Sequence, residues 1–137
     1  MQQEITIIMY HYVRELAQTP YPSINALLTS EFKSQLEFLR KNYNFVTIQD
    51  CINAIYHQMV LPPNPCLLTF DDGYVDHLTN VFPLLNQYKI QGSFFPPAKA
   101  ILEHKLLDVN KIHFLLASMN NRIDQLIKQI FLLLDNY

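Results

Sequence analysis

CLLTFDDG, residues 66–73, is an apolar run that ends abruptly in two aspartates and a glycine. A short apolar segment bounded by turn-forming residues is typical of a strand that is buried on both faces. Such strands belong to parallel sheets, and functional groups gather where these strands end. The stretch therefore predicts an α/β fold with a parallel sheet and a candidate site at Asp71 and Asp72.

Working outward from this stretch, three other segments have the β-branched or aromatic character of short strands: Ile5–Tyr10, Phe45–Ile48 and Gly92–Pro96. Apolar residues at helical spacing predict helices between and after these strands. The expected helices run through residues 32–43, 52–59, 78–88, 112–119 and 123–134. We expect Ser30 to cap the first helix. The alternation predicts one α/β domain over residues 1–137, with parallel strands and flanking helices.

The composition excludes several classes of protein. Half of the 137 residues are apolar, 16% are charged and the net charge is −2, which is typical of a folded protein. Lys and Arg are scattered singly, so we expect no nucleic-acid partner. The apolar run Ile5–Met9 is too short for a signal sequence or a membrane span, so we expect a cytoplasmic protein. Cys51 and Cys66 are then expected to be small buried hydrophobes rather than a disulfide.

The two adjacent carboxylates suggest acid–base or metal chemistry. A regular strand would send Asp71 and Asp72 to opposite faces, but Gly73 permits a turn that lets both converge on one pocket. Two acids so close resist simultaneous ionisation unless a cation is present. A divalent metal could then bind one aspartate and leave the other as a base. The alternative reading is a solvated acidic turn, because Asp and Gly are common turn residues.

The segment Leu68–Tyr74, LTFDDGY, resembles the first motif of the polysaccharide deacetylases, the NodB-homology group of carbohydrate esterases. The likeness continues in FPLL (82–85) and GSFF (92–95), and upstream in MYHYV (9–13). It spans roughly residues 5–97. The resemblance implies a partial (β/α) barrel with a divalent metal, usually zinc, at the strand ends.

Carried over residue by residue, the resemblance makes Asp71 the catalytic base and Asp72 a metal ligand. His11 ends the first strand and is expected to orient Asp71, with a structural histidine as the alternative. Tyr74 is expected to line the cleft for the carbohydrate substrate, with a packing role as the alternative. We expect the remaining histidines to lie outside the site: His57, His77 and His104 at the surface, and His113 within a helix.

Two features of the family are missing. Its metal site is completed by two histidines spaced His-x-x-x-His, and no two histidines of this chain have that spacing. Closing a barrel also takes more than the four expected strands. We therefore expect an incomplete domain with little or no activity by itself. The apolar residues 130–134 predict a helix through which the chain could self-associate.

Three hypotheses for function follow. The first is a metal-dependent hydrolase that removes acetyl groups from a polysaccharide or a lipopolysaccharide-type sugar. The second is a catalytically inactive remnant that binds carbohydrate or a partner protein. The third is a phosphotransfer domain, because such domains also use acidic strand ends, but the segment Asp71–Tyr74 fits their patterns poorly.

Overall fold

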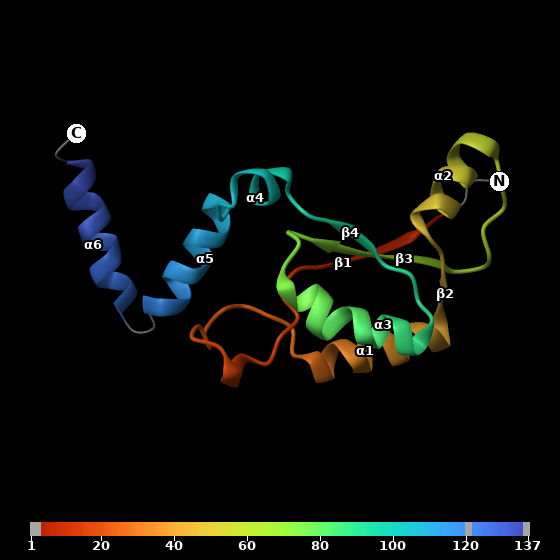
Figure 1. Ribbon diagram of the computed structural model, residues 1–137, viewed down its shortest axis with the longest axis horizontal. Coiled ribbons are helices and arrows are strands. Elements are labelled where there is room, and N and C mark those ends of the chain that lie inside the picture. The colour runs from red at the N-terminus through yellow and green to blue at the C-terminus, as the bar shows by residue number, and fades with distance from the viewer. Residues whose placement is uncertain (1–3, 120–121, 136–137) are drawn as a thin grey trace.

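The computed structural model describes residues 4–119 and 122–135 of the chain. Its sheet is built around β3 (Pro65–Asp71), and all pairings are parallel, as predicted. One edge of β3 pairs with β1 (Thr6–Tyr10). The other edge is shared by β2 (Asn44–Phe45), at the start of β3, and β4 (Ser93–Phe95), at its end. In the described part of the chain the sheet stays open and does not close into a barrel (Figure 1).

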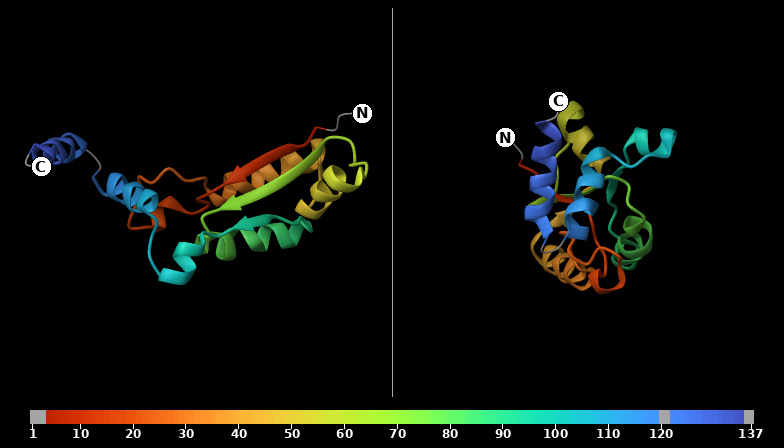
Figure 2. Two further views of the ribbon diagram at one scale, coloured as in Figure 1. Left: turned by 90° about the horizontal axis from the view of Figure 1, so that it is seen from above. Right: turned by 90° about the vertical axis from the view of Figure 1, so that its left-hand side faces the viewer.

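The helices lie along and beyond this sheet. Their bounds are α1 (Thr29–Asn42), α2 (Ile48–His57), α3 (Phe82–Tyr88), α4 (Ala98–Glu103), α5 (Asp108–Met119) and α6 (Ile123–Leu134), with a 3₁₀ turn at Leu16–Gln18 and a π-helical turn at His77–Val81. Helices α1 and α3 cover one face of the sheet, whereas α5 and α6 extend beyond the carboxyl ends of β1 and β3 (Figures 1 and 2). None of the described helices is long and apolar enough to cross a membrane.

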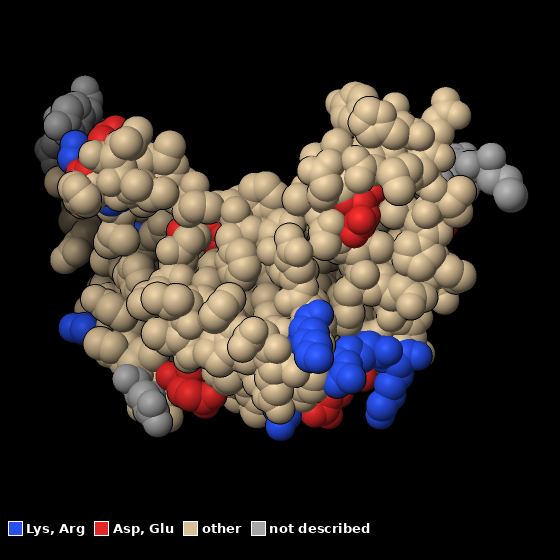
Figure 3. Space-filling view, turned by 45° about the vertical axis from the view of Figure 1, so that its right-hand side comes forward, with Lys and Arg blue, Asp and Glu red and all other residues tan. Residues whose placement is uncertain are grey.

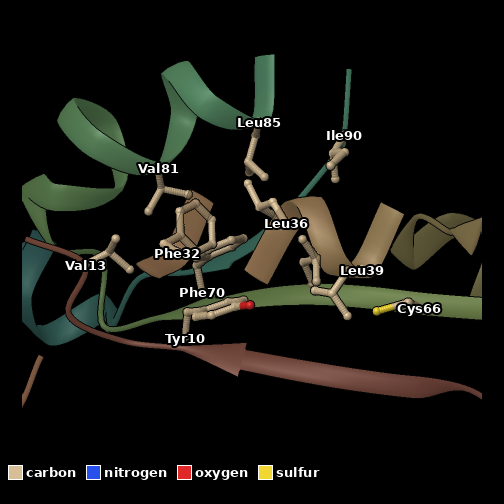
Figure 4. Close-up of a cluster of buried hydrophobic side chains, with 11 residues drawn as sticks. Tyr10, Val13, Phe32, Leu36, Leu39, Cys66, Phe70, Val81, Leu85 and Ile90 are labelled. Atoms are coloured by element: carbon tan, nitrogen blue, oxygen red, sulfur yellow. The ribbon is translucent and has the colours of Figure 1, made fainter. Parts of the chain in front are cut away.

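The main core lies between the sheet and helices α1 and α3 (Figure 4). Phe32 and Leu36 of α1 and Leu85 of α3 are almost fully buried against Phe70 of β3. Tyr10 at the end of β1 stacks on Phe70 with ring centroids 5.3 Å apart. It also contacts Phe32 edge-on, with ring centroids 5.0 Å apart. Such burial stabilises each large apolar side chain by about 1.5–3 kcal/mol. The core therefore fixes the carboxyl ends of β1 and β3 next to each other.

Two expected boundaries were wrong for the same reason, a capping interaction. Helix α1 is capped at Leu28 rather than Ser30, because the Glu31 carboxylate accepts the Leu28 N–H at 3.1 Å. Strand β2 ends at Phe45 because Thr47 caps α2. The Thr47 hydroxyl accepts the Asp50 N–H at 3.1 Å, and the Asp50 carboxylate accepts the Thr47 N–H at 2.8 Å. Reciprocal caps of this kind start helices and outweigh the β-propensity of a short segment.

The two cysteines are free and buried, as predicted. Cys66 lies in the core on β3, and Cys51 packs from α2 against a smaller cluster with Val46 and Leu67. Burial raises the pKa of both thiols, so both stay protonated near neutral pH. They act as small hydrophobic side chains.

Apolar side chains are exposed on several elements, among them α6 and β1. Helix α6 has no buried residue, and Phe131 and Leu134 are among its exposed side chains. Ile7 and Met9 of β1 are exposed on the face of the sheet opposite α1 and α3. Figure 3 shows a mostly uncharged surface that is hollowed between two raised ends, with charged side chains gathered along its lower edge.

Candidate functional site

The acidic turn at the end of β3 has an uncommon backbone. Both Asp72 (φ +70°) and Gly73 (φ +62°) adopt the left-handed conformation, which was expected for glycine only. A Cβ at Gly73 would lie 2.7 Å from the Cβ of Pro96, so the turn packs closely against the end of β4 and requires glycine. The left-handed backbone of a non-glycine residue is costly and is concentrated at functional sites. The turn therefore redirects Asp72 away from the path of the strand.

A partly buried chain of hydrogen bonds holds the Asp72 carboxylate. The Tyr74 hydroxyl donates to Asp72 Oδ2 at 2.5 Å, and Asn110 Nδ2 of α5 donates to the Tyr74 hydroxyl at 2.6 Å. Asn110 is only 4% exposed. Burial and the bond to Asp72 raise the pKa of Tyr74, so the phenol remains a donor. Asp72 is thus fixed by a helix that begins 36 residues further along the chain.

Beside this chain of hydrogen bonds, aromatic and ionic contacts join the segment after β1 to the segment after β3. The rings of Tyr12 and Tyr74 stack with centroids 4.0 Å apart. The Arg14 guanidinium lies 4.8 Å above the Tyr12 ring, and its Nε donates to Asp76 Oδ2 at 2.6 Å. The Arg14 and Asp76 side chains are only 15% and 7% exposed. These contacts hold the segments after β1 and β3 against each other.

His11 follows β1 directly, at the edge of the sheet where Asp71 ends β3. Tyr10 is paired with Phe70, so His11 and Asp71 follow at adjacent positions of neighbouring strands. Within residues 4–119 and 122–135, no hydrogen bond joins their side chains, and the orienting role of His11 stays a prediction. Asp71 is partly exposed, and none of its carboxylate oxygens is taken up by a hydrogen bond from the described residues. It is therefore available to accept a proton.

His77 does not lie at the surface, and this expectation was wrong. Its side chain is 5% exposed, and its ring lies within 6 Å of the rings of Phe70, Tyr74 and Phe94. Its Nε2 donates to the carbonyl oxygen of His11 at 2.8 Å. The π-helical turn begins at His77, three residues after Tyr74, and this spacing places His77 on the same side as the acidic turn. That spacing is the signal that could have identified it.

The ring and the hydroxyl of Tyr74 have different surroundings. Its ring lines an apolar pocket of about 270 Å³ together with Leu78, Phe82 and Phe94. Its hydroxyl is committed to Asp72 and Asn110. Contact with substrate through the Tyr74 ring stays a prediction, whereas a packing role for Tyr74 is evident from its stacking on Tyr12.

A second pocket, of about 430 Å³, lies beside His11 and includes a residue that was expected to have no site role. His113 of α5 lines it and lies with Nδ1 3.4 Å from the Tyr12 hydroxyl. The sequence could not associate His113 or Asn110 with the site, because only the folded chain brings α5 against Tyr12 and Tyr74. The complete lining is His11, Tyr12, Ser23, Ile24, Asn25, His113, Leu116 and Ala117.

The residues present do not make a complete metal site. Among residues 4–119 and 122–135, no group of three His, Cys, Asp or Glu side chains is arranged to hold a metal ion. A structural or catalytic zinc ion needs at least three protein ligands. Asp72, the expected ligand, also has one oxygen engaged by Tyr74.

Comparison with known proteins defines the class. The sequence model of the polysaccharide deacetylase family matches residues 59–130, more than half of the chain. The chain therefore belongs to the polysaccharide deacetylase family, as the motif LTFDDGY suggested. Poly-beta-1,6-N-acetyl-D-glucosamine N-deacetylase of Escherichia coli K12 is 36% identical over 91 residues, covering 65% of this chain and 13% of that protein. YxkH of Bacillus subtilis strain 168, named for polysaccharide deacetylation, is 28% identical over 100 residues, or 72% of this chain and 33% of YxkH.

Solved structures agree with this membership. The IcaB structure from Ammonifex degensii superimposes with a TM-score of 0.60 at 32% identity, covering 70% of this chain and 39% of that one. The de-N-acetylase from Aggregatibacter actinomycetemcomitans gives a TM-score of 0.58 at 28% identity, covering 67% of this chain and 37% of that one. The chain spans a third or less of the length of YxkH and of the Escherichia coli deacetylase, and less than half of these two solved chains, so it corresponds to part of a deacetylase domain.

Proposed function

We propose that this chain provides the part of a deacetylase site that contains the catalytic base, and that it acts in removing acetyl groups from a polysaccharide or a lipopolysaccharide-type sugar. The observation that carries the proposal is the placement of Asp71 and Asp72 where the buried strand β3 ends, with His11 beside Asp71. Because one relative is named for poly-β-1,6-N-acetyl-D-glucosamine, an N-acetylglucosamine polymer is the substrate that we favour.

The proposed chemistry uses Asp71 as a general base. Its unengaged carboxylate would take a proton from a water molecule as the water oxygen attacks the acetyl carbonyl carbon. The carbon–nitrogen bond then breaks as the proton that Asp71 took from water passes to the leaving nitrogen, and the amine and acetate are released. His11 would orient Asp71, and backbone N–H groups of the turn at residues 72–74 would stabilise the developing oxyanion. The Tyr74 ring would contact the sugar.

Metal dependence is part of the proposal, with Asp72 as one ligand of a divalent metal, zinc by resemblance to the family. The described residues do not supply the remaining ligands. We therefore expect weak metal binding and slow acetate release by this chain alone. Asp72 would contribute one carboxylate oxygen, while Tyr74 holds the other.

The test is acetate release from an N-acetylglucosamine oligosaccharide, with and without added Zn²⁺. We expect slow release that Zn²⁺ stimulates and that Asp72→Ala abolishes. Asp108→Ala is the matched control, because Asp108 is an exposed carboxylate that pairs with Lys111 at the start of α5. Release that is unaffected by Asp72→Ala would contradict the metal-dependent proposal.

A non-catalytic carbohydrate-binding remnant is the second candidate, favoured by the absence of a three-ligand group among the described residues. It predicts that the oligosaccharide binds to the chain but releases no acetate at any Zn²⁺ concentration. Binding and acetate release measured on one preparation therefore separate the two candidates.

A further inference from the structure

The pocket beside His11 is formed by two parts of the chain that are far apart in the sequence. Its walls are α5 and the loop between β1 and α1, which lies next to α5 in Figure 1. Tyr12, Ile24 and Ala117 form a small buried cluster that joins these walls. Tyr21 and Phe114 add a ring contact at 4.8 Å. The pocket is therefore held open by packed side chains rather than by an isolated loop.

The lining combines hydrogen-bonding and apolar side chains. Polar groups come from hydrogen-bonding side chains, including Asn25 and the two histidines, and apolar surface comes from Ile24, Leu116 and Ala117. None of the eight lining residues is Lys, Arg, Asp or Glu. A pocket of about 430 Å³ with a few polar groups around apolar surface suits a small neutral ligand with polar edges and an apolar face.

We propose that this pocket is a subsite for a neutral N-acetylhexosamine unit. The apolar face of the sugar ring would lie against Leu116 and Ala117, while its hydroxyl and acetamide groups bond to Asn25 and His113. His11 lines the pocket and also follows β1 next to Asp71, so a unit bound here lies beside the acidic turn. This assignment rests on the proposed function and adds the place where α5 contacts the substrate.

The experiment is a calorimetric titration of the full chain with an N-acetylglucosamine oligosaccharide. Leu116→Trp should fill the pocket, and His113→Ala should remove a hydrogen-bonding group. We expect each to weaken binding by about tenfold, the effect of losing one good contact. Ile112→Trp is the matched control on α5, because Ile112 is 54% exposed and lies outside the lining. The control should bind as the parent chain does, and equal binding by all variants would overturn the subsite.

Acetate release in the same variants distinguishes failure of the subsite from failure of the proposed function. Oligosaccharide binding that is lost in Leu116→Trp, without any acetate release by the parent chain, supports the subsite and contradicts the proposed function. Acetate release with an unchanged KM in both Leu116→Trp and His113→Ala overturns the subsite and leaves the proposed function intact. Because His113→Ala removes atoms rather than adding them, it keeps the test valid even if Leu116→Trp unfolds the chain.

Discussion

Asn110 Nδ2 donates a hydrogen bond to the Tyr74 hydroxyl at 2.6 Å, which links α5 to the acidic turn. The Tyr74 hydroxyl in turn donates a hydrogen bond to Asp72 Oδ2. Buried polar side chains are retained where they are fully hydrogen-bonded, and loss of one partner leaves the other with an unpaid desolvation cost. The position of the Asp72 side chain in the family motif is therefore fixed in part by α5, a helix outside that motif.

Asn110→Ala should lower the free energy of unfolding by about 1–3 kcal/mol, because the Tyr74 hydroxyl loses a buried donor. Urea unfolding followed by circular dichroism measures this change. Lys111→Ala is the control on the same helix. It removes only an exposed ion pair with Asp108, which contributes about 0–1 kcal/mol. Equal effects of the two substitutions would show that the bond to Tyr74 does not stabilise the fold.

The ion pair between Arg14 and Asp76 gives a second stability prediction. Arg14→Met keeps an apolar side chain of similar length, but it removes the guanidinium above Tyr12 and leaves the Asp76 carboxylate buried without its cation. We expect a loss of about 3 kcal/mol in urea unfolding. Glu103→Gln, which affects an exposed pair with Lys105, should cost much less. Adding Asp76→Leu to Arg14→Met should recover most of the loss, and a further loss in the double variant would argue against the unpaired charge as the cause.

Tyr10 predicts how stability changes at alkaline pH. Burial of the ring, and then the nearby Cys66 thiol, raise the pKa of Tyr10 from 10.0 to about 12. The folded state keeps this proton to a higher pH than the unfolded state does. The stability contributed by protonated Tyr10 is therefore fully present below pH 10 and is lost as the pH rises from 10 to 12.

Tyr10→Phe should remove part of this alkaline loss. Unfolding midpoints in urea at pH 9 and pH 11 measure it, and the parent chain should lose more stability over this interval than the Phe variant does. Tyr56→Phe is the control, because Tyr56 is 76% exposed and should leave the alkaline loss unchanged. If Tyr10→Phe and the parent chain respond identically, Tyr10 is not the group responsible.

Most of the sheet was predictable from the sequence, whereas the surroundings of the site were not. CLLTFDDG predicted the buried central strand, because an apolar run followed by turn residues depends only on local pattern. The roles of Asn110, His113 and His77 depend on contacts between distant segments and on a π-helical turn, neither of which has a local pattern. The caps at Leu28 and Thr47 use residues close in the sequence, but the Ser30 side chain and the β-propensity of residues 45–48 favoured other boundaries.

Self-association through α6 also stays a prediction. Its exposed apolar side chains, among them Ile130, would lose contact with water in a dimer. Sedimentation velocity should show a concentration-dependent dimer for the parent chain and a monomer for Ile130→Lys. Gln129→Lys introduces the same charge at the neighbouring exposed position and should still dimerise. A parent chain that stays monomeric at high concentration would contradict the prediction.

The most direct test of the central claim, that Asp71 is the catalytic base, is the rate of acetate release by Asp71→Asn. The substitution keeps the shape of the side chain and removes its ability to take a proton. We predict a fall of about 10²–10⁴-fold relative to the parent chain, the usual contribution of a general base, with unchanged oligosaccharide binding. An Asp71→Asn variant that releases acetate at the parent rate would contradict the assignment of this acidic turn as the deacetylase site.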